Sequence, residues 1–140
     1  MSGPGLDARQ ITEFLDEVSP GVTEWLVIDA VGDHRARVRV SAGPERLRPG
    51  GIVAGPVLMS LVDAAVWVAV LGVVGPVPMA VTANLNVSFL RPAPPGDVIA
   101  DAQLHKVGKR LAVGEVLVTA DGDAAAVAVA TVTYALPSKR

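Results

Sequence analysis

The chain has 140 residues, of which 51% are hydrophobic, and a formal net charge of −2. This length and composition predict one domain, residues 1–140, with a sizeable apolar core, and the charge excludes the uniformly basic surface of nucleic-acid-binding proteins. With no cysteine and two histidines, the chain has no disulfide framework and cannot supply an ordinary zinc site, so we expect no metal.

The N-terminal segment, residues 1–22, is expected to be helical. Apolar residues recur at helical spacing between positions 6 and 18, and Ser19-Pro20-Gly21 ends the pattern. The segment lacks a basic stretch followed by an apolar one, so no secretory signal is visible and we expect a cytoplasmic protein.

Two strands are predicted next, over residues 23–31 and 34–41, joined by a turn at Gly32-Asp33. In the second strand arginines alternate with apolar residues, which places three guanidinium groups on one face: Arg35, Arg37 and Arg39. A solvated sheet face is the simpler explanation, and an anion-binding role is the alternative. A loop over residues 43–51 then leads into the central helix.

The central helix is the most apolar part of the chain. Gly55-Pro56 is typical of a helix start, because proline at the first helical position has a suitable φ and needs no N–H there. Over residues 57–71 only Ser60 and Asp63 interrupt the apolar run, so the helix must be buried on most sides. Glycines and prolines over residues 72–78 break the run before it reaches membrane length, which favours a core helix and no membrane.

Asp63 is the residue in this helix that needs an explanation. An unpaired carboxylate in an apolar interior is costly, so Asp63 either finds a hydrogen-bonding partner or faces a cleft in which it works. The N–H of Gly55, at the positive end of the helix, is a candidate oxyanion donor. Eight residues at about 1.5 Å each place the two groups roughly 12 Å apart, too far to serve one substrate from one chain. Two antiparallel helices in a two-fold dimer would bring Gly55 of one chain to Asp63 of the other.

The rest of the chain consists of predicted strands. Residues 79–91 alternate regularly, so we expect Val81, Ala83, Leu85, Val87 and Phe89 to point one way and Thr82, Asn84, Asn86 and Ser88 the other. So many short polar side chains suit a wet or functional face, which makes Asn84 a candidate for substrate contact. Further strands are predicted over residues 97–107, 111–120 and 124–136. One long buried helix and about six antiparallel strands predict an α+β fold, with the sheet wrapped round the helix.

The helix that carries Asp63 and the strand VTANLNVSFLRPA, residues 81–93, followed by PPGD, resemble the hotdog-fold acyl-CoA thioesterases, in particular the phenylacetate-pathway (hydroxyphenylacetyl-CoA) type. The resemblance covers residues 45–136 and rests mainly on SLVDAA in the helix and NVSFLRP in the strand. It implies a hotdog fold with a five- to six-stranded antiparallel sheet. It also implies a homodimer that pairs into a homotetramer and hydrolyses an acyl-CoA, with coenzyme A as part of the substrate and no separate cofactor.

The resemblance also implies roles for three residues. In that family the helix opens with His-Gly-Gly, the first glycine N–H polarises the thioester carbonyl, and an aspartate two turns later acts from the partner subunit as base or nucleophile. By position, these roles fall to Gly55 and Asp63. Thr82 stands where the family has a hydroxyl that helps to position the attacking water.

Three positions depart from the family pattern. Ala54 and Pro56 stand where the family has His and the second Gly, and Arg48 stands where it often has an asparagine. These departures bear on substrate choice, because Arg48 would bring a positive charge close to the thioester or the acyl chain.

The remaining substrate contacts that we expect are cationic and apolar. The candidates for the phosphates of coenzyme A are Arg91, Lys109 and Arg110, and basic turns on a solvated surface are the alternative. The acyl group would lie among four residues for which core packing is the alternative: Val57, Leu58, Leu61 and Trp67.

Two other functions stay open at this point. One is a non-catalytic hotdog protein that binds an acyl-CoA or another apolar ligand. The other is a hydroxyacyl thioester dehydratase, which pairs a histidine with its acid; no histidine is near Asp63 in sequence, but His34 or His105 could approach it in space. Ser60 lacks the G-x-S-x-G motif of serine hydrolases, and neither a P-loop nor a Rossmann fingerprint is present.

Overall fold

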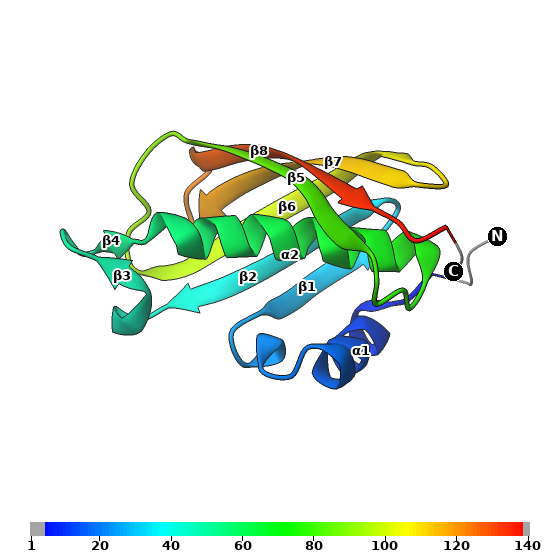
Figure 1. The fold of residues 1–140 in the computed structure, drawn as a ribbon. Coiled ribbons are helices and arrows are strands. Elements are labelled where there is room, and N and C mark those ends of the chain that lie inside the picture. The colour runs from blue at the N-terminus through cyan, green and yellow to red at the C-terminus, as the bar shows by residue number, and fades with distance from the viewer. Residues whose placement is uncertain (1–4, 139–140) are drawn as a thin grey trace.

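A six-stranded sheet wraps round one long helix in the computed structural model, which describes residues 5–138 (Figure 1). The strands follow the order β1-β2-β6-β7-β8-β5 across the sheet, and every neighbouring pair is antiparallel. Their bounds are β1 Val27–Gly32, β2 Arg35–Ala42, β5 Val81–Phe89, β6 Gly96–Val107, β7 Leu111–Ala120 and β8 Ala126–Ala135. The predicted α+β architecture is confirmed, with six strands in the sheet.

Helix α2, Gly55–Val74, is the core of the molecule, and the sheet covers it along its length (Figure 1). It is long and apolar enough to span a bilayer, but 61% of its most apolar 18-residue window is buried inside the protein, as in a core helix. The helix continues three residues past its predicted end at residue 71. Gly72 allows β1 to pack closely there, because a Cβ at this position would lie 2.6 Å from Val31 Cγ2. The helix ends at Gly75, whose φ of 89° suits glycine.

The N-terminal helix α1, Ala8–Val18, begins later than predicted because Asp7 caps it. The Asp7 carboxylate accepts a hydrogen bond from the Gln10 N–H, and the Gln10 side-chain oxygen accepts one from the Asp7 N–H. The helix lies beside β1 and buries Ile11 and Leu15 (Figure 1).

The segments on either side of the first hairpin are shorter or more structured than expected. A 3₁₀-helix, Val22–Glu24, occupies the start of the predicted strand 23–31. The turn between β1 and β2 is formed by Asp33 and His34, with φ of 54° and 62°, so His34 lies in the turn and not in the strand. The predicted loop 43–51 holds a 3₁₀-helix, Pro44–Arg46, and the first strand of a short hairpin made of β3, Leu47–Arg48, and β4, Ile52–Val53.

Strand β5 forms one edge of the sheet, and its register with β8 shifts between Thr82 and Asn84. Antiparallel partners lie on the same face of a sheet. Thr82 lies opposite the buried Tyr134 and therefore faces α2, whereas Asn84 lies opposite Thr133 and faces away. The prediction that Thr82 and Asn84 share a face was wrong, because the irregularity at Ala83 inserts one extra residue into the alternation.

Candidate active site

Two hydroxyl groups hold the carboxylate of Asp63. Thr82 Oγ1 donates a 2.7 Å hydrogen bond to Asp63 Oδ1, and the Tyr134 hydroxyl donates a 2.9 Å hydrogen bond to the same oxygen. The Tyr134 oxygen also lies 3.2 Å from the main-chain oxygen of Asp63. Within residues 5–138, Asp63 takes part in no ion pair and its Oδ2 accepts no hydrogen bond. Uncharged donors therefore fix the Asp63 carboxylate, and its Oδ2 has no hydrogen-bond donor among the described residues.

Tyr134 is the residue of this site that sequence reasoning missed. It lies on β8 and is 3% exposed. Burial raises the pKa of Tyr134 well above its ordinary value; the Thr82 hydroxyl lowers it and the Asp63 charge raises it further. The hydroxyl thus stays protonated and acts as a donor. A signal was present in the sequence, since Tyr134 is the only tyrosine of the chain and sits in an apolar strand, where a tyrosine hydroxyl needs a partner.

The N-terminus of α2 presents one free backbone donor within the described part of the chain. The first N–H groups of a helix have no partner in the helix itself. Here Pro56 has no N–H, and the N–H groups of Val57 and Leu58 turn back to the oxygen of Ala54, at 3.0 and 3.4 Å. Only the N–H of Gly55 is left without a hydrogen bond among these residues. The helix start therefore offers a single donor to an anion or a polarised carbonyl.

Gly55 and Asp63 lie on the same unbroken helix. The rise of an α-helix separates them by roughly 12 Å. One carbonyl carbon cannot lie within reach of both groups of the same chain.

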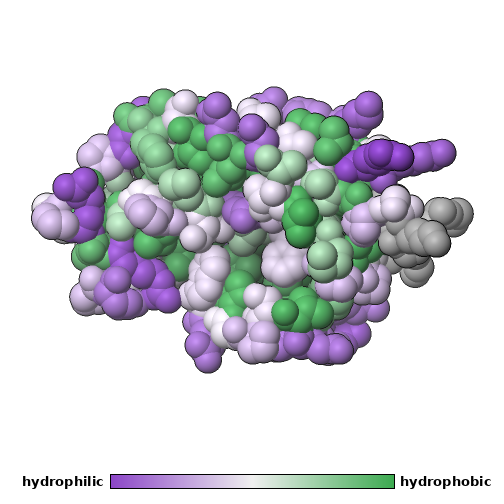
Figure 2. Space-filling model, viewed as in Figure 1, coloured by the Kyte–Doolittle hydropathy of each residue, from purple (hydrophilic) through white to green (hydrophobic). Residues whose placement is uncertain are grey.

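A hollow of about 400 Å³ lies next to Gly55. It is formed by the β3–β4 hairpin, the start of α2 and the segment that follows β5, and it includes both Arg48 and Arg91. No acidic residue lines it, and neither arginine forms an ion pair within residues 5–138; their Nε atoms donate to the main-chain oxygens of Pro49 and Ala126, respectively. Apolar side chains gather over the end of β5 and the start of α2 (Figure 2), where Phe89 is 51% and Leu90 52% exposed. The hollow is thus apolar with a positive rim.

The other predicted site residues lie elsewhere. Pro56 is exposed at the start of α2. Trp67 lies one turn after Asp63 on the helix, and its Nε1 is buried without a hydrogen-bond partner among the described residues. Asn84 is on the sheet face turned away from Asp63. Lys109 and Arg110 lie in the β6–β7 turn, and the main-chain oxygen of Arg110 accepts a hydrogen bond from the Leu136 N–H just after β8. Arg91 donates to Ala126 at the start of β8, so the turn and Arg91 lie at opposite ends of this strand.

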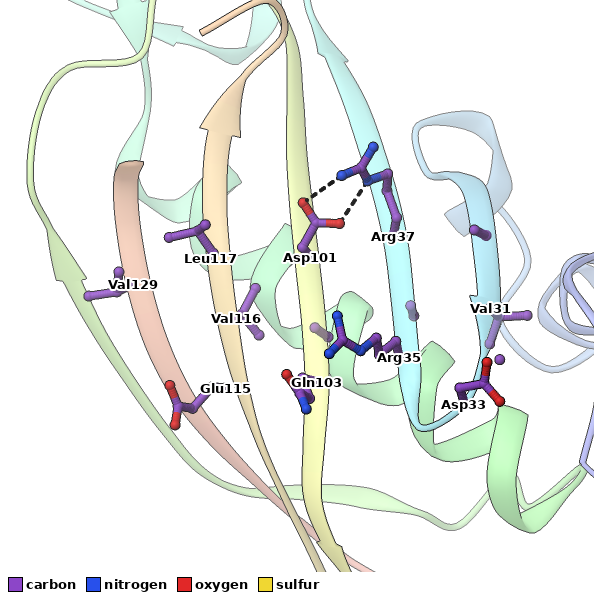
Figure 3. A pocket seen from close by; sticks show the side chains of 14 residues that line it. Val31, Asp33, Arg35, Arg37, Asp101, Gln103, Glu115, Val116, Leu117 and Val129 are labelled. Atoms are coloured by element: carbon purple, nitrogen blue, oxygen red, sulfur yellow. Dashed lines mark hydrogen bonds and ion pairs between the residues drawn. The ribbon is translucent and has the colours of Figure 1, made fainter. Parts of the chain in front are cut away.

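A second hollow lies on the outer face of the sheet, and none of the predicted site residues lines it. It measures about 630 Å³ and is crossed by the ion pair between Arg37 and Asp101 (Figure 3). Two of the three arginines of β2 are paired on this face, since Arg39 contacts Asp29 and Asp97. The solvated-face explanation therefore fits Arg37 and Arg39 better than an anion site.

Comparisons with known proteins identify the family of the chain. The model of the Thioesterase superfamily matches residues 50–127, more than half of the chain. A protein of Halobacterium salinarum named "Putative esterase" is 39% identical over 98 residues, which are 67% of this chain and 64% of that protein; the match thus spans less than two thirds of the relative.

Solved structures show the same fold. A "putative thioesterase" from Silicibacter is 35% identical with a TM-score of 0.88, over 97% of this chain and 95% of that one. A variant of the phenylacetic acid degradation protein of Thermus thermophilus is 25% identical with a TM-score of 0.71, over 89% and 99% of the two chains. Zebra fish thioesterase superfamily member 2, at 20% identity, a TM-score of 0.82 and coverage of 95% and 100%, shares the fold. The chain has the hotdog fold and belongs to the Thioesterase superfamily.

Proposed function

We propose that the protein hydrolyses an acyl-CoA thioester at two composite sites of a homodimer. One observation carries the proposal: α2 holds both the fixed carboxylate of Asp63 and the free N–H of Gly55. The two groups are too far apart for one substrate carbonyl to contact both within a single chain. A two-fold axis places the donor of each chain beside the acid of the other.

Strand β5 supports this dimer. It is an edge strand of nine residues without proline or lysine, and such an exposed edge is a surface for pairing with another chain. One end of β5 carries Thr82, which binds Asp63, and the other end carries Phe89, which lies beside Gly55. Antiparallel pairing of β5 with β5 of a second copy would therefore bring the Asp63 end of one chain to the Gly55 end of the other.

In the proposed reaction the thioester carbonyl oxygen accepts a hydrogen bond from the Gly55 N–H. Asp63 of the other chain takes a proton from water, whose oxygen bonds to the carbonyl carbon; the C–S bond then breaks, and the thiolate takes up a proton to give coenzyme A and a carboxylic acid. In the alternative, Asp63 bonds directly to the carbonyl carbon and the C–S bond breaks; the thiolate leaves and takes up a proton, and water then cleaves the anhydride to release the carboxylic acid and restore Asp63. Thr82 contacts Asp63 in both.

The substrate contacts follow from the same dimer. Arg48 and Arg91 line the hollow beside Gly55. In the antiparallel dimer, the β6–β7 turn of the second chain would approach this hollow, because it lies at the Asp63 end of that chain. The phosphates of coenzyme A would then meet Arg91 together with Lys109 and Arg110. Trp67 Nε1 is a buried donor that a substrate or a second subunit could satisfy. Arylacetyl-CoA thioesters of the phenylacetate-pathway type are the first substrates to test.

The dehydratase alternative finds no support in the positions of the histidines. His105 Nε2 lies 2.7 Å from Glu115 Oε1, and His34 lies in the β1–β2 turn. Neither forms a hydrogen bond with Asp63.

The experiment measures thiol release from a panel of acyl-CoAs by the wild type, by Asp63→Asn and by Gly55→Ala, alone and as mixed dimers. We expect both variants to lose most activity and the mixture to recover about a quarter of the wild-type rate, because random re-pairing makes half of the dimers mixed and each of these has one intact site of two. No recovery on mixing would contradict the composite site. Thermal stabilisation by an acyl-CoA without turnover would instead indicate a non-catalytic binding protein.

We also propose a cytoplasmic location. We further propose that the dimers pair into a tetramer, and sedimentation of the purified protein tests this assembly.

A further inference from the structure

We propose that Tyr134 is a positioning residue for the reaction: it fixes Asp63 by Oδ1, together with Thr82, and leaves Oδ2 as the oxygen that takes the proton or attacks the carbonyl. This inference rests on the proposed thioesterase function. It follows from the convergence of two hydroxyl donors on one oxygen, at 2.7 and 2.9 Å, with no donor on the other among the described residues.

The two donors differ in how firmly they are placed. Tyr134 lies on β8 between two hydrogen-bonded neighbours, with Ala112 of β7 on one side and Thr82 of β5 on the other. Thr82 lies on the edge strand, next to the irregularity at Ala83. The sheet interior therefore defines the position of the Tyr134 hydroxyl, and this hydroxyl sets the rotation of the Asp63 carboxylate.

Fixing one carboxylate oxygen makes the two oxygens different. Both hydroxyl hydrogens point at Oδ1, so Oδ2 is the oxygen left open to a water molecule or a carbonyl carbon. A carboxylate that can rotate freely presents its reactive oxygen only part of the time, and a misplacement of about 1 Å can reduce a rate by about a hundredfold. Positioning by Tyr134 should thus act on kcat, because Tyr134 is 3% exposed and offers almost no surface for direct contact with the substrate.

The test compares Tyr134→Phe with a matched control, Thr133→Val. Phenylalanine keeps the ring in the core and removes only the hydroxyl. Thr133→Val removes a hydroxyl from the neighbouring residue of β8, on the opposite face of the sheet. We expect Tyr134→Phe to lower kcat about tenfold or more while KM stays within about twofold, and Thr133→Val to change neither.

A spectroscopic measurement gives a second readout that leaves the fold intact. Because Tyr134 is the only tyrosine of the chain, biosynthetic 3-fluorotyrosine places a single fluorine label beside this hydroxyl. We expect its ¹⁹F resonance to shift in Asp63→Asn and to stay in place in Thr133→Val.

The outcomes separate this inference from the proposed function. An active wild type, an inactive Asp63→Asn and a fully active Tyr134→Phe would overturn the role of Tyr134 alone. A rise in KM without a fall in kcat, or an unmoved fluorine resonance in Asp63→Asn, would overturn it as well. A wild type that hydrolyses no acyl-CoA removes the proposed function and this inference together.

Discussion

Gly55 and Phe89 are neighbours at the start of α2: a Cβ added to Gly55 would lie 3.7 Å from Phe89 Cζ, an ordinary van der Waals distance. The backbone at Gly55 has no positive φ. Nothing in the described chain therefore requires glycine at this position for folding. A requirement for glycine here would come from a ligand that approaches the free N–H.

Gly55→Ala should consequently leave the fold intact and impair catalysis. The methyl group would stand in the space through which a carbonyl reaches the N–H, and loss of one oxyanion donor typically lowers kcat by about a hundredfold or more. Steady-state kinetics and thermal unfolding check this together. Gly43→Ala is the control, because Gly43 has φ of −80° and does not line the hollow beside Gly55, and its added Cβ would meet only the flexible end of Glu45. Equal activity of the two variants would contradict the role of Gly55.

The high pKa of Tyr134 predicts how stability changes in alkaline solution. In the unfolded chain the phenol ionises at about pH 10, whereas in the folded chain burial raises its pKa and keeps it neutral. Because the folded-state pKa is the higher one, this contribution to stability is complete below about pH 10 and is lost as the pH rises further.

We therefore expect the phenolate absorbance band of the native protein to appear only together with unfolding, as followed by circular dichroism. Tyr134→Phe should lose less stability than the wild type over the same alkaline range. A phenolate band that develops at about pH 10 in folded protein would show that the hydroxyl is accessible to water.

Arg39 joins strands through several carboxylates on the outer face of the sheet. It donates to Asp29 at 2.8 Å and to Asp97 at 2.9 Å, and Asp121 lies at 3.8 Å. Arg39→Met would leave these acids facing one another, so we expect the free energy of unfolding to fall by about 1–3 kcal/mol at low salt and by less at high salt.

Arg37→Met is the matched control on the same strand and face. Its ion pair with Asp101 is more exposed, at 51% and 38% of the two side chains, and should contribute about 0–1 kcal/mol. Urea unfolding at two salt concentrations measures both variants. Equal losses would show that the Arg39 cluster stabilises no more than a single surface ion pair.

The exposed edge of β5 predicts the effect of charge on assembly. Asn84 and Asn86 face away from α2, so lysines at these positions keep the core intact while placing like charges along paired edges. We expect the double variant Asn84→Lys/Asn86→Lys to be folded, monomeric by sedimentation and inactive. A control with lysine at Thr131, on β8 inside the sheet, should keep the wild-type assembly; an active monomer would rule out the composite site.

The sequence by itself determined the architecture and the separation of the two central groups. The apolar run round Asp63 predicted a buried helix, because a helix that is apolar on nearly all sides must be covered. The residue spacing between the helix start and the carboxylate set their distance along the helix axis. Alternation and turn signals together located the six strands of the sheet to within a few residues, and Gly55-Pro56 placed the start of α2.

Only the tertiary structure decided which side chains meet at Asp63. Thr82 reaches it because one extra residue at Ala83 reverses the facing that strict alternation predicts, and a bulge of this kind depends on pairing with β8 and leaves no mark in periodicity. Tyr134 lies 71 positions from Asp63 in the chain, and strand order alone brings its hydroxyl to the carboxylate. Local sequence patterns report how each segment is folded, whereas contacts between distant segments are set by the packing of the whole sheet round the helix.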